Sequence, residues 1–505
     1  MPHSILYTPA WNAHALLTCD EMRRAEQETY AQGVESYTLM CRAGEAVAQH
    51  ILDRSTPRKT IVLCGPGNNG GDGYVCAEAL RGKGWDITVA ILQPATQALP
   101  PDAARAAQAW QGPTVACESL SFDDYKLVVD ALFGAGLKRP LEGLALRTLE
   151  KLAQAATRVV AVDLPSGLDG DSGKILGRAP QAQSTVTFFR KKRGHLLEPG
   201  ASLCGEIIVA DIGIAPQTLA KLNPLAAENA PELWHNQFPY PTVAGHKYTR
   251  GHALIYGSAA MTGAARLAAR AAQRMGAGVV TVASPTSALP IYAATLESGI
   301  VQPVDELRAW QCLFADSRRN VILIGPGLGI GALQRDMVLA ALESGKTCVL
   351  DADALTNFEN EPQTLLRALH PGCVLTPHEG EFARIFETRI DSREDKMSRA
   401  TKAADLAHCC ILLKGADTMI AAPEGHAVVN HNAPPWLATA GAGDVLAGLI
   451  TGLTAQKMPI FQASCAAAWI HGDIAARFGS GLIAEDLVDG IPAALKSLSV
   501  QSSIV

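Results

Sequence analysis

The chain has 505 residues, of which 48% are hydrophobic and 18% are charged, and its formal net charge is -6. This length is too great for one ordinary core and predicts two to four domains, and the apolar fraction excludes a disordered protein. The small net charge gives no field that would attract nucleic acid or an acidic membrane, so we expect neither as a partner.

The 12 cysteines include no CxxC pair, and most lie in apolar stretches such as the one around Cys64. Buried, reduced thiols in a reducing compartment explain this pattern best. The N-terminus lacks the basic start and the apolar run of a signal peptide, and no apolar stretch reaches the roughly 18 residues of a membrane span. We therefore expect a cytoplasmic protein.

Short β-branched runs alternate with Ala-rich segments along both halves of the chain. In the first half the runs predict strands at Thr60–Cys64, Ile87–Leu92, Leu127–Leu132, Val159–Asp163, Thr185–Phe189 and Glu206–Ala210. In the second half they predict strands at Ala253–Gly257, Val279–Ala283, Val321–Gly325, Cys348–Asp351, Val374–Thr376, Cys410–Lys414 and Met419–Ala422. Helical spacing predicts helices between them, such as Gly263–Met275 and Gly443–Leu453. This alternation is typical of parallel sheets covered by helices on both faces, so the predicted fold class is α/β.

The domain boundary is indicated by a break in this alternation. After Gly213 the pattern stops, and residues 215–240 carry four prolines without strong periodicity. We predict one domain over residues 1–214, a linker over 215–240 and a second, different α/β domain over 241–505.

The motif GPGNNGGDG at Gly65–Gly73 stands between a predicted strand and a helical segment. Its glycines let a ligand approach the backbone, and the helix N-terminus offers free N–H groups to a phosphate. Asn68 and Asn69 present side-chain amides, and Asp72 can cap the helix or hold a ribose hydroxyl. A tight turn without a ligand is the alternative, which so dense a set of glycines and asparagines disfavours.

Two other strand ends carry acidic residues. Asp130 ends one predicted strand and precedes a Gly-rich loop at Gly134–Pro140, and Asp163 ends another, with Ser166 just beyond. Ligands of open parallel sheets bind beyond the carboxyl ends of the strands. Each acid alone could be a helix cap, but three such strand ends in one domain favour a binding site.

These segments, GNNGGDG, VDALFGAGL and AVDLPSGLDGDSG, resemble the motifs of the NAD(P)H-hydrate epimerase domain over roughly residues 10–214. The resemblance implies a Rossmann-like three-layer α/β/α sandwich. It implies that the hydrated nucleotide is held by Asn68, Asn69, Gly70, Gly71, Asp72, Gly134, Ala135, Gly136, Leu137, Lys138, Arg139, Pro140 and Asp163. It also implies a potassium ion on Asn69, Asp130 and Ser166, whose oxygens suit a hard cation. We expect Asp163 to be the general acid/base that lets the C6 hydroxyl leave and return on the other face.

The second half carries weaker signals and one stronger one. The glycines of VILIGPGLG follow a predicted strand, and His378 in VLTPHEGEF stands where a capping residue is as plausible as a catalyst. Lys414 ends a strand and could contact a phosphate. In GAGD, at Gly441–Asp444, the glycines open a helix whose N–H groups form an anion hole, and Asp444 can deprotonate a hydroxyl aimed at a phosphoryl group.

The set GPGLG, LTPHEGEF, LLKGADT and TAGAGDVLAG resembles the nucleotide-dependent NAD(P)H-hydrate dehydratase domain, of ribokinase-like fold, over about residues 240–495. The resemblance implies that ADP or ATP is bound by Lys414, Gly415, Ala416, Asp417, Thr418, Gly441, Ala442 and Gly443. It implies that Gly327, His378 and Asp444 contact the S hydrate. With Mg²⁺, Asp444 would then drive phosphorylation of the C6 hydroxyl, followed by elimination of phosphate.

The predicted protein is therefore a bifunctional isomerase and lyase for hydrated NADH and NADPH, expected to be a homo-oligomer. The fusion resembles the bacterial arrangement, in which ADP is the usual donor. Two departures affect the nucleotide fit: Tyr248 and Arg250 replace glycines usual after His-Lys, and Ala442 replaces a threonine. The rival functions are a small-molecule kinase with an accessory nucleotide-binding domain, and a non-catalytic nucleotide sensor.

Overall fold

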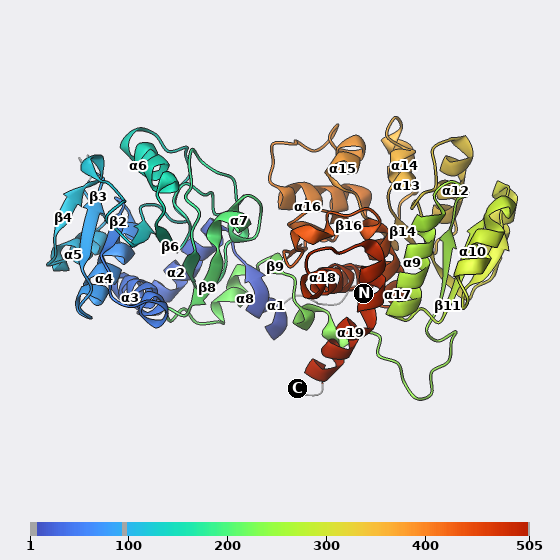
Figure 1. Cartoon of the computed structure of the whole chain (residues 1–505), viewed down its shortest axis with the longest axis horizontal. Coiled ribbons are helices and arrows are strands. Elements are labelled where there is room, and N and C mark those ends of the chain that lie inside the picture. Colours follow the sequence, from blue (N-terminus) through green and yellow to red (C-terminus); the bar gives the residue numbers. More distant parts are fainter. Residues whose placement is uncertain (1–7, 93–97, 503–505) are drawn as a thin grey trace. The chain divides into compact units, whose positions relative to one another are not determined.

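A computed structural model describes residues 8–92 and 98–502, with side chains up to residue 499. The outermost residues of the two predicted domains, 1–7 and 503–505, lie outside the described ranges. The chain divides into two compact units, Met1–Ala226 and Ala227–Val505 (Figure 1). None of the helices in the described ranges is long and apolar enough to cross a membrane.

The elements of the first unit are α1 (Pro9–His14), β1 (Ala15–Leu16), α2 (Cys19–Ala31), α3 (Ser36–Arg54), β2 (Thr60–Cys64), α4 (Asn68–Arg81), β3 (Ile87–Ile91), α5 (Pro101–Ala109), β4 (Thr114–Ala116), η1 (Cys117–Ser119), β5 (Leu127–Ala131), α6 (Gly143–Gln154), β6 (Arg158–Val162), β7 (Ser184–Phe188), η2 (Arg193–His195), α7 (Gly200–Cys204), β8 (Glu206–Ala210) and α8 (Thr218–Leu222).

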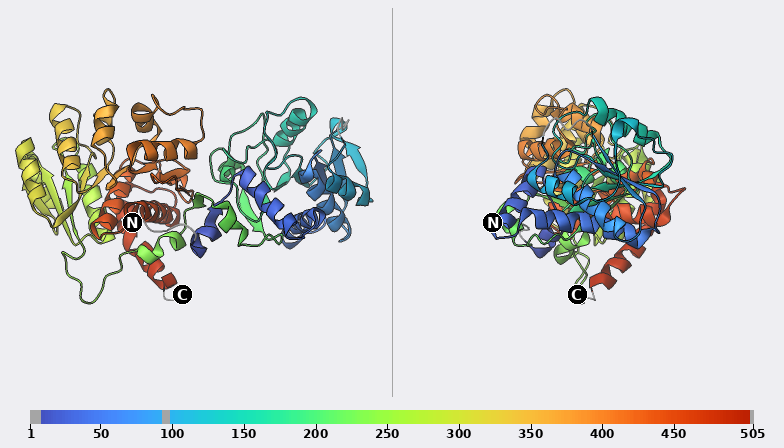
Figure 2. Two further views of the ribbon diagram at one scale, coloured as in Figure 1. Left: turned by 180° about the vertical axis from the view of Figure 1, so that it is seen from behind. Right: turned by 90° about the vertical axis from the view of Figure 1, so that its left-hand side faces the viewer.

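The first unit is a parallel sheet with strand order β4-β3-β2-β5-β6-β7-β8. Side chains alternate between its faces, as the pleat requires. Val62 and Cys64 join the core beneath α3, α4 and α5, while Ile61 and Leu63 join a second core beneath α6. Helices therefore cover both faces (Figure 2), which confirms the predicted three-layer arrangement.

The elements of the second unit are β9 (Ala226–Glu228), η3 (Pro231–Leu233), η4 (His235–Gln237), β10 (His252–Tyr256), α9 (Thr262–Met275), β11 (Val279–Ser284), η5 (Thr286–Ala288), α10 (Leu289–Thr295), β12 (Ile300–Pro303), α11 (Leu307–Cys312), η6 (Leu313–Ala315), β13 (Arg319–Ile324), α12 (Ala332–Glu343), β14 (Thr347–Leu350), α13 (Asp353–Thr356), α14 (Pro362–Ala368), β15 (Cys373–Leu375), α15 (Glu379–Phe386), α16 (Lys396–Ala407), β16 (Cys410–Leu413), β17 (Thr418–Ala421), β18 (Ala427–Asn430), η7 (Pro435–Leu437), α17 (Ala442–Ala455), α18 (Ile460–Phe478) and α19 (Ala484–Ser502).

The sheet of the second unit runs β9-β18-β17-β16-β15-β14-β13-β10-β11-β12. It is parallel from β12 to β16, but β16, β17 and β18 pair antiparallel, where we expected parallel strands only. The reason is the connection between β16 and β17, residues 414–417, which is too short for the crossover that a parallel pair needs.

All the strands predicted from the sequence are present to within two residues of the predicted bounds, and so are the two predicted helices. The short strands β1, β4, β9, β12 and β18 were not predicted, because their runs are brief. Residues 215–240, our predicted linker, contain α8, β9 and two single-turn helices, and they bury Leu219 and Trp234. This segment therefore carries ordered structure of its own, and the domain bounds stay predictions.

Candidate active sites

Each sheet has a point where the strand order reverses, and the Gly-rich loops follow the strands at these points. In the first unit the chain proceeds from β2 toward β4 and then from β5 toward β8, so the reversal lies between β2 and β5. In the second unit the reversal lies between β10 and β13. The crevice beyond the carboxyl ends of such strands is where open α/β sheets bind ligands.

In the first unit, Asp163 lies directly after β6 with a positive φ of 64°. Its Oδ1 accepts hydrogen bonds from Lys192 Nζ at 2.6 Å and from Thr187 Oγ1 at 2.9 Å, and its Oδ2 accepts one from the Ala135 N–H at 3.0 Å. The side chain of Lys192 is 1% exposed and that of Asp163 is 12% exposed. The Lys192 ammonium is thus buried, whereas part of the Asp163 carboxylate remains exposed to solvent.

The motif around Asn69 reaches the same place. Gly134 lets the loop after β5 pass close to Asn69 and Asp163, because a Cβ there would lie 2.7 Å from Asn69 Oδ1 and 3.0 Å from Asp163 Oδ2. The Nδ2 atom of Asn69 is buried without a hydrogen-bond partner among the described residues. Three segments far apart in the sequence, those of Asn69, Gly134 and Asp163, therefore meet at one sheet edge, as predicted from their strand ends.

Asp130 and Ser166 form a buried pair beside this edge. Ser166 donates to Asp130 through its Oγ at 2.6 Å and through its N–H at 2.8 Å, and Phe133 N–H donates to Ser166 Oγ at 2.8 Å. Burial raises the pKa of Asp130, although the hydrogen bonds from Ser166 act against it. The donor set is made of carboxylate, hydroxyl and amide oxygens, and this chemistry fits a hard monovalent cation.

Two residues that contact Asp163 were not predicted from the sequence. Lys192 stands in a basic run that looks like a surface stretch, yet it contacts Asp163. His195 is fully buried; its Nδ1 accepts from the Lys192 N–H at 2.8 Å and its Nε2 donates to the Asp163 carbonyl at 2.7 Å. Burial and the Lys192 charge lower the pKa of His195 to about 4, so the ring is neutral near pH 7. No local pattern signals either residue.

The carboxyls of the first site differ in acidity. Burial acts to raise the pKa of Asp163, but the charge and the hydrogen bond of Lys192 outweigh it and bring that pKa below its usual value. Burial raises the pKa of Asp72 well above its usual value, and the charges of Asp163 and Glu26 add to this. One carboxyl of the site is therefore an anion, and another favours its acid form.

In the second unit the loops after β13, β14, β15 and β16 meet at one edge. Gly325, with φ of 128°, allows the first loop to pass close to β14, because a Cβ there would lie 1.7 Å from the Asp351 carbonyl oxygen. Lys414 Nζ, after β16, donates to Asp351 Oδ1 at 2.6 Å. A Cβ at Gly443 would lie 3.8 Å from Lys414 Nζ and 3.9 Å from Asp351 Oδ2, so the start of α17 closes over this ion pair.

Asp444 follows Gly443 in the first turn of α17. Burial and the nearby charge of Asp351 raise its pKa to about 6, and Lys414 acts in the opposite direction. A carboxylate whose pKa lies near neutrality is suited to general base catalysis. Asp351, which we predicted as the last residue of a strand and gave no role, follows β14 and is thus the second carboxylate of this site.

His378 is the N-cap of α15. Its Nδ1 accepts from the N–H groups of Gly380 at 3.0 Å and Glu381 at 3.2 Å, and its own N–H donates to Glu381 Oε2 at 2.8 Å. The capping role weighed from the sequence is therefore present, and Nε2 faces the Glu381 carboxylate at 3.4 Å. The side chain is 56% exposed, so it remains open to a ligand.

Hydrogen bonds from Lys396, a residue that we did not predict, hold the loop Lys414–Thr418 in place. Lys396 Nζ donates to Asp417 Oδ1 at 2.7 Å and to the Lys414 carbonyl at 3.3 Å. A Cβ at Gly415 would lie 2.2 Å from the same Nζ, so a larger residue there would displace this ammonium from its present position. The loop predicted to bind a nucleotide is thus fixed by a cation.

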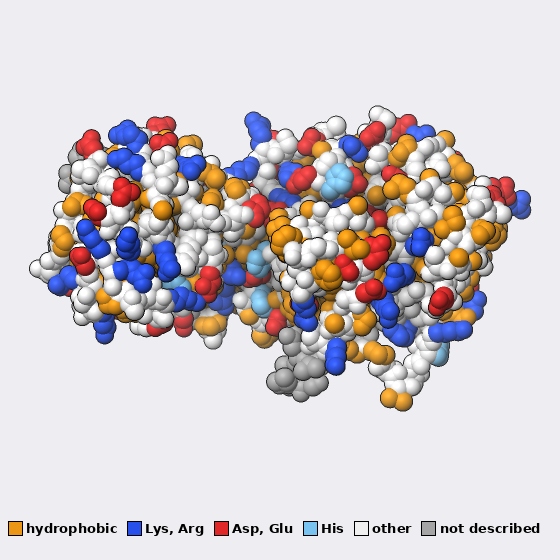
Figure 3. Space-filling view, in the orientation of Figure 1, with side chains coloured by type: hydrophobic (Ala, Val, Ile, Leu, Met, Phe, Trp, Pro, Cys, Tyr) orange, Lys and Arg blue, Asp and Glu red, His pale blue; other side chains and the backbone are white. Residues whose placement is uncertain are grey.

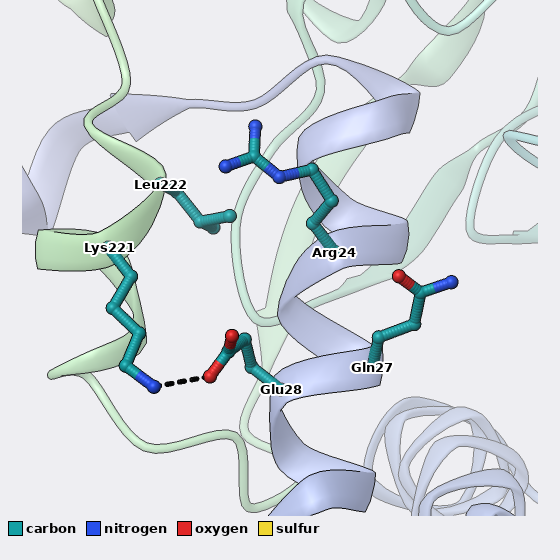
Figure 4. Close-up of a pocket in the computed structure, with 5 residues that line it drawn as sticks. All are labelled: Arg24, Gln27, Glu28, Lys221 and Leu222. Atoms are coloured by element: carbon teal, nitrogen blue, oxygen red, sulfur yellow. Dashed lines mark hydrogen bonds and ion pairs between the residues drawn. The ribbon is translucent and has the colours of Figure 1, made fainter.

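Two hollows lie away from these loops. One, of about 270 Å³, lies between α2 and α8 and is lined by Arg24, Gln27, Glu28, Lys221 and Leu222, with Lys221 paired to Glu28 (Figure 4). The other, of about 360 Å³, includes Asn320, Thr347 and Gly372, which begin or precede strands of the second sheet. Neither hollow contains a predicted site residue.

Charged side chains of both signs are interspersed on the face of the protein shown in Figure 3. Basic side chains on that face lie among acidic ones over both units. This face therefore presents no continuous basic surface of the kind that binds nucleic acid.

Comparison with known proteins gives matches to both halves. Residues 36–194 match a family model described as the YjeF-related protein N-terminus, and residues 252–491 match one described as NAD(P)H-hydrate dehydratase. The chain is 36% identical to the bifunctional NAD(P)H-hydrate repair enzyme Nnr of Moorella thermoacetica, over 96% of this chain and 97% of that protein. It is 32% identical to the enzyme of the same name from Escherichia coli, over 96% and 95% of the two chains.

Among solved structures, an ADP/ATP-dependent NAD(P)H-hydrate dehydratase from Bacillus subtilis, co-crystallised with ATP and Mg²⁺, is similar to the chain. It shares 27% identity with a TM-score of 0.47 over 54% of this chain and 98% of that one.

Proposed function

The chain belongs to the family of bifunctional NAD(P)H-hydrate repair enzymes, and from this premise we propose that its two units carry out two linked repair steps. The first unit epimerises the R and S forms of hydrated NADH and NADPH. The second dehydrates the S form at the expense of ADP or ATP, which gives NAD(P)H, phosphate and AMP or ADP. Because damage produces both epimers, an epimerase on the same chain lets a dehydratase selective for S consume both.

For the first step, the observation that supports the proposal most is the meeting of Asn69, Gly134 and Asp163 at one sheet edge. The segments Asn68–Asp72 and Gly134–Pro140 would hold the hydrated nucleotide there, and Asp163 would exchange a proton at C6. A potassium ion would be held by oxygens of Asn69, Asp130 and Ser166. When bound, it supplies positive charge that favours anionic groups of the site.

For the second step, the supporting observation is the position of Asp444 at the start of α17, next to the Lys414–Asp351 ion pair. Asp444 would take the proton of the C6 hydroxyl as this oxygen attacks the terminal phosphoryl group. The N–H groups at Gly441–Gly443 and Lys414 would stabilise the phosphoryl oxygens, and Mg²⁺ would neutralise phosphate charge when bound. Phosphate then leaves far more readily than hydroxide would.

The remaining ligand contacts are also proposals. Gly327 and His378 would contact the S hydrate, and the loop Lys414–Thr418 would bind ADP or ATP. The replacement of threonine by Ala442 removes one hydroxyl from the nucleotide side of the site. We further propose that the protein works in the cytoplasm, which cell fractionation would test, and that it is a homo-oligomer, which sedimentation would test.

The decisive experiment incubates mixed R and S hydrates with the full chain, Mg²⁺ and either ADP or ATP, and follows the return of the reduced-nicotinamide absorbance. We expect nearly complete recovery, because the R form is converted to S during the assay. Recovery of the S fraction alone would refute the epimerase activity. Phosphorylation of a hydroxymethyl substrate, without action on the hydrates, would favour the kinase alternative.

Two variants separate the steps. Asp163→Asn should stop the interconversion of R and S in the absence of ADP and ATP, while dehydration of S continues. Asp444→Ala should stop dehydration but leave nucleotide binding and epimerisation intact. Normal turnover of either variant would refute the role given to its residue. Replacing K⁺ by a large organic cation should slow only epimerisation.

A further inference from the structure

The hydrogen bonds around Asp163 fix it as an anion. Its two oxygens accept three donors, and one of these is the buried ammonium of Lys192 at 2.6 Å. An ammonium that is 1% exposed needs a carboxylate beside it, because an uncompensated buried charge is costly. Asp163 therefore meets the substrate in its ionised form.

This state leaves one half of the epimerisation without a proton donor. The hydroxyl at C6 leaves readily only as water, so an acid must give it a proton. The anion of Asp163 can take a proton from an incoming water, but it has none to give. A second group is needed for the departing hydroxyl.

Asp72 is placed to be that group. It lies three residues after Asn69 on α4, so the two side chains lie on the same side of the helix. Asn69 Oδ1 faces the Gly134 loop, which Asp163 Oδ2 also faces. Among the residues that the structure describes, none donates a hydrogen bond to the Asp72 side chain, in contrast to the three donors on Asp163.

The surroundings of Asp72 favour its acid form. Burial and the charges of Asp163 and Glu26 raise the pKa of Asp72 well above its usual value, and Lys192 offsets this only in part. The other titratable groups that interact with Asp72 or Asp163 are Cys19, Glu26 and Tyr30 on α2, Cys76 on α4, Lys192, His195 and Cys204. Two carboxyls with opposed proton states in one site are the usual mark of an acid and a base.

We propose that epimerisation uses two carboxyl groups, with Asp72 giving its proton to the hydroxyl that leaves C6 and Asp163, fixed by Lys192, taking a proton from the water that returns. This inference rests on the proposed epimerase function. The C6–O bond breaks, the hydroxyl and the Asp72 proton leave as water, and the N1 lone pair forms the C6=N1 bond.

A water oxygen then bonds to C6 on the opposite face, and the electrons of the C6=N1 bond return to N1. The excess proton of this water goes to Asp163. Asp163 passes this proton to solvent and so stays the anion that the buried Lys192 ammonium requires, while Asp72 takes a proton back from solvent. Exchange with solvent restores the starting form, and atoms and charge balance.

The test uses the full chain without ADP or ATP, and separates the R and S hydrates by chromatography over time. Asp72→Asn keeps the size of the side chain and its ability to bind a hydroxyl, but it carries no acidic proton. We expect kcat to fall by about 100-fold or more while KM changes by less than about 3-fold. Asp72→Glu should recover part of kcat. Glu26→Gln, the matched change at a third carboxyl near Asp72, should leave kcat close to wild type.

The outcomes are separable. If the wild-type chain does not interconvert the hydrates, the epimerase function and this inference both fall. If the wild type is active and Asp72→Asn keeps kcat but raises KM, Asp72 only binds the nucleotide and the inference alone is overturned. Loss of kcat in Glu26→Gln with retention in Asp72→Asn would also overturn it. Thermal unfolding of each variant, compared with wild type, shows that the loss of kcat occurs in a folded protein.

Discussion

The acidity of Asp444 offers a test of the dehydratase site through its neighbour Asp351. The pKa of Asp444 is raised from 3.8 to about 6 by burial and, next, by the charge of Asp351. Because Asp444 is proposed to act as a base, the dehydratase rate should fall as pH drops through this value. Asp351→Asn removes a negative charge and also releases Lys414 from its 2.6 Å ion pair. Both changes stabilise the Asp444 anion, so the acid limb should move to lower pH.

The size of this shift follows from Coulomb's law. Two unit charges roughly 7 Å apart interact by about 1 kcal/mol at an effective dielectric constant of about 40, between the values for water and for a protein surface. That energy corresponds to somewhat less than one pH unit. The acid limb of kcat/KM for the S hydrate should therefore move from near pH 6 to near pH 5.

The assay measures kcat/KM for S-hydrate dehydration from about pH 4.5 to 8, with ADP or ATP and Mg²⁺ saturating. A matched control is Asp353→Asn, since the charge of Asp353 also raises the pKa of Asp444 but by less than the charge of Asp351 does. The limb should therefore move less in this variant. An unmoved limb in Asp351→Asn, or a shift to higher pH, would refute the reasoning about the charges around Asp444.

Three further predictions concern stability and binding. Asp444→Asn should abolish dehydration yet raise the free energy of unfolding at pH 7. Folding raises the pKa of Asp444 from 3.8 to about 6, so ionising this carboxyl destabilises the folded protein. This loss of stability develops between pH 3.8 and 6 and is complete above pH 6. Urea unfolding at pH 7 should show a gain of at most about 3 kcal/mol, reduced by partial exposure, and no gain below pH 3.8. Gly134→Ala places a methyl group 2.7 Å from Asn69 Oδ1 and should lower epimerase kcat/KM by about 10-fold or more without changing dehydration, which chromatography of the hydrates can follow. Lys396→Met removes the cation that holds Asp417 and should raise the KM for ADP or ATP by about 10-fold with a smaller change in kcat; an unchanged KM would exclude its role in holding the loop.

The longer strands and the strand-end motifs of both units could be predicted from the sequence alone. Apolar runs separated by helical spacing favour buried parallel strands, although they did not reveal the antiparallel pairs of β17. Gly-rich segments after the strands leave room for a ligand. The meeting of Asn69, Gly134 and Asp163 followed from this logic, because the carboxyl ends of parallel strands share one edge.

The proton states and the charge partners of the carboxyls could not be predicted without the folded structure. Lys192 stands in a run of basic residues that looks like a solvated stretch, and it is a buried partner of Asp163 only because the fold brings Lys192 and His195 to the residue after β6. Asp351 and Lys414 are 63 residues apart, and no local pattern joins them. The charge partner of a residue depends on long-range packing, whereas strands, turns and helix starts depend on neighbouring residues. For this reason the sequence predicted where the sites lie but not the pKa shifts of their carboxyls.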